Sequence, residues 1–531
     1  MDFDEGGDMR SSLLAASLTG CFLLSSGCGS ESAGGLSPGG NAQDAAPANA
    51  QDAAPANAQD AAPANPQDAA VERAQDAAPA GAPDAAAVSP PDAAANDAQA
   101  STPEPSPEAG ANPEPMARSS LVRVTAELDD TEKGEMAQSL SGFAFALLQE
   151  VRRDPAAKDN FAFSPTSVSL ALAMAYAGAM GNTAVQMKAA MHVAAANDAY
   201  FRSLNWLDQQ LGSRAAAALK QAQDLFARSG GSGTAPDPAD YRLQVVNAAW
   251  GERTMTFEQP YLDTLATEFG AGIHLADFKT QPEAERLAIN AWVSEETLDR
   301  INDLIPAGAI DPLTRAVLVN AIHLKLPWYD PFSASATTSA LFTKTDGSTV
   351  SVPFLNKTAT RSYAEDDTTQ AVAVPLSGGS IDFVVFLPKA TSSLAQLEDS
   401  LSPARAQALI ARMGSQGVAL ALPKFTFTTA SVSLRTVLTA LGMTDAFGAK
   451  ADFSGITKEA QLFISDVFHK AMVAVDEHGV EAAAATAVIM GERGAPTDVK
   501  QMDVNRPFFF GIYDRPTATW LFLGHVTDPS S

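Results

Sequence analysis

Residues His469–Ala487 read HKAMVAVDEHGVEAAAATA, and the alanine run in this stretch commits to neither a helix nor a strand. Alanine is the best helix former and a poor strand former, whereas Val488 and Ile489, which follow the run, favour strands. The segment then continues into Gly491–Pro496, which has the composition of an exposed loop. Such a segment suits a part of the chain that is loop in one state and strand in another.

Upstream of the globular region lies a long segment of low complexity. From Asn41 to Pro115 the chain is almost entirely Ala, Pro, Asp, Asn, Gln and Glu, and the octapeptide NAQDAAPA begins at Asn41, Asn49 and Asn57. A short repeat without large apolar residues cannot bury enough surface to offset the entropy lost on ordering. We therefore expect residues 29–118 to be a disordered linker and residues 119–531 to form the folded domain.

The N-terminus has the features of an export signal. An apolar run from Leu13 to Leu24 follows Met9-Arg10; it is too short to span a bilayer but suits the core of a signal peptide. The run ends in LLSSGCGS and resembles a bacterial lipoprotein signal over residues 1–28, with Cys28 or Cys21 as the lipidated residue. A plain secretory signal is the alternative. The predicted location is exported, either lipid-anchored at the bacterial cell envelope or surface, or secreted.

Several runs in the folded region are apolar at consecutive positions, as expected of strands covered on both faces. Ser167–Ala179 instead predicts a buried helix, and helical patterns come mainly before the strands, which indicates an α+β fold. Phe508–Tyr513 and Trp520–Val526 predict a closing hairpin. The other predicted strands are Ala316–Leu324, Phe383–Pro388 and Val418–Leu422.

No motif for catalysis, nucleotide binding or metal binding occurs in the sequence. A nucleophile elbow, a zinc-binding H-E-x-x-H, a Walker loop and a dinucleotide-binding glycine motif are all missing, and the six histidines show no ligand spacing. Both cysteines precede the linker, so the folded domain has neither a disulfide nor a cysteine-bound metal. The net charge of −27 argues against binding to nucleic acid and against charge-driven binding to anionic lipid. We expect no enzyme, no cofactor and no metal.

The motifs of the folded region, taken in order, resemble those of the serpin family over roughly 400 residues. The resemblance implies three β-sheets, called A, B and C, about eight or nine helices and an exposed reactive-centre loop. The matching stretches are NFAFSPTSVSLALAMAYAGAMGNT (160–183), INAWVSEETLDRI (289–301), TRAVLVNAIHLKLPW (314–328), LPKF (422–425), ADFSGI (451–456), HKAMVAVDEHGVEAAAATA (469–487) and the C-terminal RPFFFGIYD and LFLGHVTDP.

The resemblance also gives the alanine-rich segment a function. In inhibitory serpins a protease cleaves the loop, becomes acylated, and is dragged along as the loop inserts as a new strand of the main sheet. Alternation along such a strand would place Val480, Ala482 and Ala484 on its inward face and Glu481 on the other face, toward solvent. The hinge and inserting loop implied are Glu477, Gly479, Val480, Glu481, Ala482, Ala483, Ala484, Ala485 and Thr486.

Two other interpretations of the segment stay open. It could be an ordinary alanine linker, or the chain could be a non-inhibitory serpin-fold binding or carrier protein, whose hinge often carries bulky or charged residues or proline. No such residue occurs at the inward positions from Gly479 to Thr486, although Val480 stands where Thr or Ser is usual.

Counting from the hinge glycine, the resemblance places the reactive bond at Arg493–Gly494. Arg493 is also the only basic residue between Gly479 and Val499, and its guanidinium would pair with a carboxylate in a trypsin-like specificity pocket. The predicted partner is therefore a trypsin-like serine protease, held as a covalent acyl-enzyme. An elastase-like, subtilisin-like or cysteine protease is the alternative, with Met490 or a nearby bond as bait.

The resemblance implies two further groups of residues. Ser164, Ser167, Asn290 and His469 match a polar cluster, the shutter, beneath the main sheet. Trp328 and Lys424 match the breach, where insertion begins, and Lys424 would pair with Glu477. The segment Ala215–Asp240 lies near a helix that binds sulfated polysaccharide in some serpins, but it carries no dense basic stripe, so we expect no strong heparin site. A monomer is expected.

Overall fold

The computed structural model describes residues 115–531 except 232 and 482–497, and every structural statement below concerns these residues. Short 3₁₀ turns occupy Pro155–Lys158, Pro238–Asp240, Ala334–Ala336 and Asp445–Phe447, and a π-helical turn, Leu265–Phe269, follows α5. The helices of the described residues are α1 (Asp130–Val151), α2 (Pro165–Tyr176), α3 (Gly181–Ala190), α4 (Asn197–Arg228), α5 (Gln259–Thr264), α6 (Pro282–Glu296), α7 (Leu394–Ser400), α8 (Pro403–Arg412) and α9 (Arg435–Ala440).

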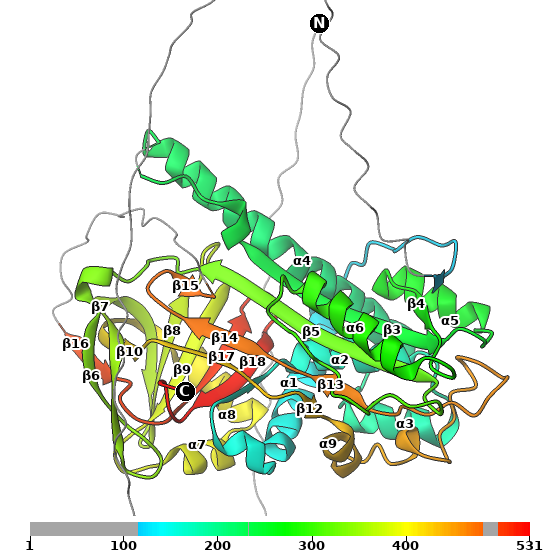
Figure 1. Ribbon diagram of the computed structural model, residues 1–531. Helices are drawn as coiled ribbons and strands as arrows, with labels where there is room; N and C mark the ends of the chain where they lie inside the picture. Colours follow the sequence, from blue (N-terminus) through cyan, green and yellow to red (C-terminus); the bar gives the residue numbers. More distant parts are fainter. Residues whose placement is uncertain (1–114, 232, 482–497) are drawn as a thin grey trace, which may run out of the picture. The chain divides into compact units, whose positions relative to one another are not determined.

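The first sheet, which corresponds to the predicted main sheet, is built around one long central strand, β5 (Ala316–Pro327) (Figure 1). Near its start β5 pairs in parallel with β13 (Val467–His469), and at its end it pairs with the two-residue strand β15 (Gly479–Val480). The remaining strands are β1 (Met116–Ala117), β3 (Arg242–Glu252), β4 (Ile273–Ala276), β11 (Phe425–Thr428), β12 (Val432–Ser433) and β14 (Met472–Val475).

The second sheet contains the predicted C-terminal hairpin, in which β17 (Phe508–Asp514) pairs with β18 (Thr519–Val526). The predicted third sheet is continuous with it, because the 17-residue strand β7 (Thr349–Glu365) runs through both parts. The other strands are β2 (Phe161–Phe163), β6 (Thr338–Thr343), β8 (Thr369–Pro375), β9 (Ile381–Pro388), β10 (Gly414–Pro423) and β16 (Val499–Asp503).

Both faces of the central strand are buried, which explains its nearly continuous apolar sequence. Leu318, Ile322, Leu324 and Leu326 point into the main core, and the intervening Val317, Val319 and Ala321 point toward α6, which crosses the front of the sheet in Figure 1. Helix α2, predicted to be buried, has all twelve residues buried.

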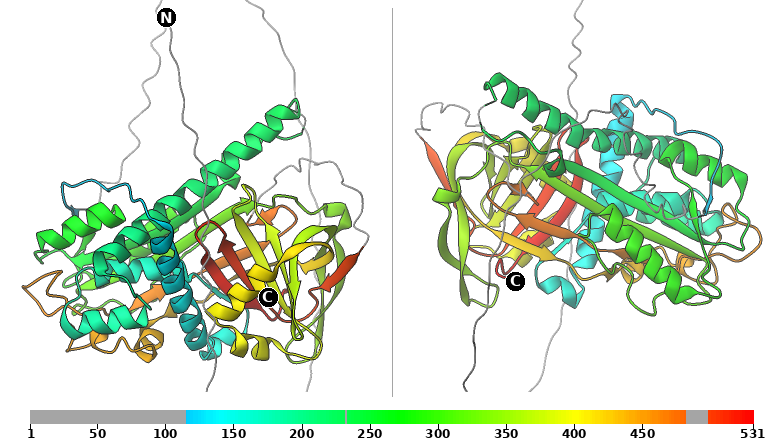
Figure 2. Two further views of the ribbon diagram at one scale, coloured as in Figure 1. Left: turned by 180° about the vertical axis from the view of Figure 1, so that it is seen from behind. Right: turned by 45° about the horizontal axis from the view of Figure 1, so that its top comes forward.

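The Ala-rich segment that follows the buried part of α4 extends the helix to Arg228, and Figure 2 shows this end projecting past the sheets. Arg214 fixes the extension by a bidentate ion pair with the buried Asp514, at 2.8 and 3.2 Å. Within the described part of the chain, no helix combines the length and the apolar character needed to cross a bilayer.

Candidate functional site

The hinge of the loop already forms part of the main sheet. Val480 lies between Leu326 of β5 and Val475 of β14, and its side chain is buried in the core. Figure 1 shows β15 as a short strand at the end of the sheet, between these two longer strands. The inward orientation that alternation gives Val480 is therefore present in this structure, and Gly479 and Val480 form a strand of the main sheet.

Glu481 lies on the face opposite Val480, but the prediction that it points to solvent is wrong. Its side chain is 7% exposed, and its carboxylate contacts Arg300 and His323. His323 is on the α6 face of β5, and Arg300 follows α6, so this face of the sheet is covered where Glu481 meets it. Strand alternation assigns a face correctly but cannot tell whether another segment covers it.

The breach residues are in contact at the point where β15 enters the sheet. Lys424 Nζ lies 2.7 Å from Glu477 Oε2, and the Thr337 hydroxyl donates to Oε1 of the same carboxylate at 2.9 Å. Burial raises the pKa of Glu477, but the hydrogen bond from Lys424 and those from the backbone and Thr337 outweigh burial and hold the pKa below its usual value. The buried Trp328 donates its indole N–H to the Asp476 carbonyl at 2.8 Å.

The described residues also include one group that could supply metal ligands. Asp476, Glu477 and His478 each offer an atom within 4.8 Å of the others. Asp476 already accepts from the backbone N–H groups of His478 and Gly479, and Glu477 is paired with Lys424. These contacts account for the arrangement as a turn that starts the hinge, so we assign no metal here.

The shutter cluster lies beneath the main sheet and is centred on His469. The Ser164 backbone N–H donates to Nε2 of His469 at 3.0 Å, so Nδ1 carries the proton and donates to Asn320 Oδ1 at 2.6 Å. Asn320 in turn donates to Ser167 at 2.6 Å and to Asn247 at 2.7 Å. The cluster thus links β13 and β5, which are direct neighbours here, to the start of α2.

Placing Asn290 in this cluster was wrong. Its side chain makes a reciprocal pair of hydrogen bonds with the backbone of Ile305, at 2.8 and 2.9 Å, and fixes the segment that follows α6. Asn320 takes the position in the cluster that was assigned to Asn290, and a feature of the sequence could have indicated this. Asn320 is the polar residue at an inward position of β5, between Leu318 and Ile322, where it needs a buried partner.

The rest of the predicted site lies outside the described residues. This applies to the inserting residues Ala482, Ala483, Ala484, Ala485 and Thr486, to the reactive bond Arg493–Gly494, and to Cys21 and Cys28. Their roles stay predictions, as do the signal peptide and the linker.

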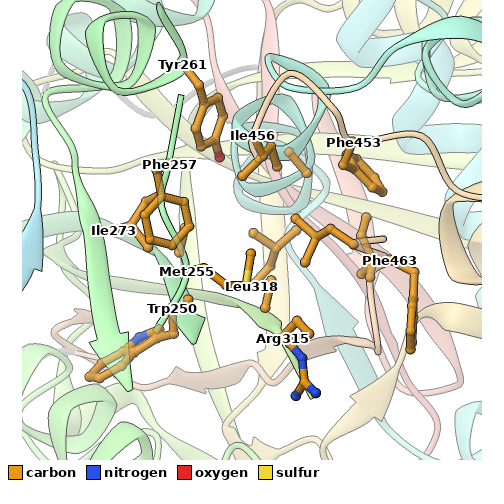
Figure 3. Close-up of a pocket in the computed structure, with 16 residues that line it drawn as sticks. Trp250, Met255, Phe257, Tyr261, Ile273, Arg315, Leu318, Phe453, Ile456 and Phe463 are labelled. Carbon is orange, nitrogen blue, oxygen red and sulfur yellow. The ribbon is translucent and has the colours of Figure 1, made fainter. Parts of the chain in front are cut away.

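A small cavity is lined by residues near the start of β5, whereas the hinge pairs with the end of this strand. Figure 3 shows the side chains that line it. Its volume is about 30 Å³, and side chains such as Phe257, Leu318, Phe453 and Ile456 make its lining mostly apolar. The buried Tyr261 also lines the cavity, and burial raises the pKa of its hydroxyl. No nucleophile–base pair is present among the described lining residues, so the cavity does not have the composition of a catalytic site.

The burial of His469 predicts a pH dependence of stability. Burial lowers the pKa of His469 from 6.5 to about 4, so in this range the unfolded chain binds more protons than the folded chain. The stability from neutral His469 is complete above pH 6.5 and is lost as the pH falls toward 4, a loss of about 3 kcal/mol. Burial acts oppositely on Asp382, whose pKa is raised to about 6, so stability from that group is lost as the pH rises.

The variant His469→Gln separates these two contributions, because glutamine can still accept and donate but does not titrate. We expect urea-unfolding curves between pH 4 and 7 to show a steeper acid loss for the wild type than for the variant. If the free energy of unfolding changes with pH in the same way in both proteins, His469 is not the group that causes the loss of stability in acid.

Comparisons with known proteins agree with this architecture. A family model described as Serpin (serine protease inhibitor) matches residues 138–529. An uncharacterized serpin-like protein of Thermococcus kodakarensis is 34% identical over 411 residues, which cover 76% of this chain and 89% of that protein. The native structure of a thermophilic serpin, tengpin, matches with a TM-score of 0.65 and 26% identity, over 77% of this chain and 97% of that one. Thyroxine-binding globulin in complex with thyroxine matches with a TM-score of 0.61 and 26% identity, over 74% of this chain and 99% of that one.

Proposed function

The chain belongs to the serpin family, whose members are typically protease inhibitors, and on this premise we propose that it is a suicide-substrate inhibitor of a trypsin-like serine protease. In this proposal the target protease supplies the catalysis. Its serine hydroxyl attacks the carbonyl carbon of Arg493, an ester forms, and the bond to Gly494 breaks as the amine leaves with a proton. The inhibitor itself supplies the bait and the sheet that accepts the cleaved loop.

The register of the inserted hinge is the observation that supports this mechanism best. Val480 pairs with Leu326 on one side and with Val475 on the other. Continued for six residues, this register brings Thr486 between Asn320 and His469, the two central residues of the shutter. The cleaved loop would therefore extend a strand that has already begun, and each step would add hydrogen bonds on both sides.

The same register identifies what must separate before the strand can grow. Residues 467–469 of β13 pair directly with residues 318–320 of β5, and His469 bonds to Asn320 across this junction. Insertion as far as Thr486 requires these contacts to open. We infer that the shutter sets how easily the lower half of the sheet accepts the loop.

A carrier function is the alternative, and thyroxine-binding globulin is a structural neighbour that binds a small molecule. The cavity of about 30 Å³ in this chain exceeds the roughly 10–15 Å³ that holds one water, but it is small for a ligand of that kind. The inserted hinge supports an inhibitory function, and the small cavity does not support a carrier function. We therefore propose inhibition as the function of this chain.

We further propose that residues 1–28 direct export, that Cys28 or Cys21 carries a lipid, and that residues 29–118 tether the domain to the cell envelope. The apolar run before Cys28 and the repeats that follow it support this proposal. The target protease would then meet the inhibitor outside the cytoplasm.

Mixing the full chain with trypsin at near-equal concentrations tests the proposed function. We expect a band on denaturing gels at the summed mass of the two proteins, and a released C-terminal peptide that begins at Gly494. Cleavage after Arg493 without the covalent band would show that the loop is bait but that trapping fails. If neither product forms with trypsin, the assigned bond and protease class are wrong.

A further inference from the structure

Glu481 directly follows β15 and is the last described residue of this segment. Its backbone N–H still donates to the Ala474 carbonyl of β14, at 2.7 Å, so the ladder reaches this residue. Its φ angle is +51°, a left-handed conformation that non-glycine residues rarely adopt and that ends an extended strand. The strand therefore stops at Val480, because the backbone turns away at the next residue.

Two side chains contact the carboxylate of Glu481 in this conformation. Arg300 Nε lies 2.6 Å and His323 Nε2 lies 3.0 Å from the same carboxylate oxygen, Oε1. The side chains of Glu481 and His323 are both below 10% exposed, whereas that of Arg300 is about half exposed. Nδ1 of His323 is buried and has no partner within the described residues, so Glu481 is the polar group that satisfies this ring.

Further insertion requires a change in the conformation of Glu481. In the register of β15, an extended residue 481 would lie opposite Lys325, and Ala483 would take the position opposite His323. The backbone of Glu481 must then change from a positive to a negative φ, which would move its carboxylate away from its present position against Arg300 and His323. The loop therefore cannot extend the strand past Val480 while Glu481 keeps this conformation.

We propose that Glu481, Arg300 and His323 form a hinge clamp, which holds the resting loop at two inserted residues and limits the rate of further insertion. The regulatory part of this inference rests on the proposed inhibitory function, because the clamp matters to a protease only if insertion traps it. The three residues act as positioning groups for the loop and do not contact the reactive bond. Arg300 follows α6, so the clamp also ties the hinge to the segment that covers the front of the sheet.

Amide hydrogen exchange on the full chain tests the clamp without any protease. We expect the amides of Val480 and Glu481 to exchange about tenfold faster in Arg300→Ala and in Glu481→Gln than in the wild type. The double variant should show no further increase, because both changes remove the same contact. Lys458→Ala is the matched control, since this lysine makes an exposed ion pair with Glu258, away from the hinge.

The rate of inhibition of trypsin is the second measurement on the same variants. We expect Arg300→Ala and Glu481→Gln to form the covalent complex about tenfold faster than the wild type, with Lys458→Ala unchanged. Wild-type exchange rates in both variants would overturn the clamp, whatever the inhibition result. Faster exchange with an unchanged rate of complex formation would overturn its control of insertion. Faster exchange with no complex from any protein, the wild type included, would refute the proposed function and leave the clamp as a structural contact.

Discussion

If the proposed inhibitory function is correct, Ala484→Glu is expected to turn the chain into a substrate that the protease cleaves and releases. The register of the inserted hinge places residue 484 between Ile322 and Ala471, both of which are buried in the main core. A carboxylate brought there has no partner among these neighbours and would cost several kcal/mol to bury. Because that cost falls on the inserting strand, hydrolysis of the acyl-enzyme should finish before the loop can trap the protease.

The ratio of inhibitor cleaved to protease trapped measures this effect. We expect the ratio to rise by at least about tenfold in Ala484→Glu, which corresponds to only part of the burial cost. Ala483→Glu is the matched control, because residue 483 would lie on the opposite face beside His323, a side chain that already contacts the carboxylate of Glu481 and could contact this one. If both variants trap trypsin as well as the wild type, insertion does not follow this register.

Arg493→Ala is expected to abolish the inhibition of trypsin. Trypsin-like proteases recognise a basic side chain through a carboxylate at the base of the specificity pocket, and alanine leaves that carboxylate unpaired. We expect the second-order rate constant of inhibition to fall by about 100-fold or more. The hinge and the shutter are unchanged in this variant, so its native structure and its stability should match the wild type.

Arg493→Lys serves as the control for Arg493→Ala, because the ammonium group can still reach the pocket carboxylate. It should retain inhibition of trypsin at a reduced rate. A gain of inhibition toward an elastase-like protease in Arg493→Ala would confirm that this residue selects the target. Unchanged inhibition of trypsin by the alanine variant would move the reactive bond to another residue.

The elements that rest on local pattern were predicted from the sequence. The apolar runs at Ala316–Leu324 and Phe383–Pro388 became strands covered on both faces, and the C-terminal hairpin formed as expected. The Lys424–Glu477 contact, implied by the resemblance, is present at 2.7 Å. The strands and the hairpin could be predicted because periodicity is a property of neighbouring residues, whereas the Lys424–Glu477 contact joins distant residues and was expected only from the resemblance.

The residues that make up the shutter could not all be predicted from motifs. Asn290 and Asn320 both follow an apolar residue in a family-like motif, yet only Asn320 reaches His469, across 149 positions of the chain. Asn290 lies on α6 and Asn320 on β5, and it is the pairing of β5 with β13 that places Asn320 next to His469. A motif match alone could not make this choice.

By itself, the sequence indicated the family and the order of the elements, because both depend on local composition and on the spacing of motifs. It also predicted an uncharged inward face for the inserting loop, and this stays a prediction. Only the tertiary structure decided that two residues of the hinge are already inserted, that Asn320 completes the shutter and that Glu481 is buried. The physical reason is the same in all three cases. Burial and hydrogen bonding depend on which distant segments share a surface, and Arg300, His323 and Glu481 meet only once the main sheet has formed.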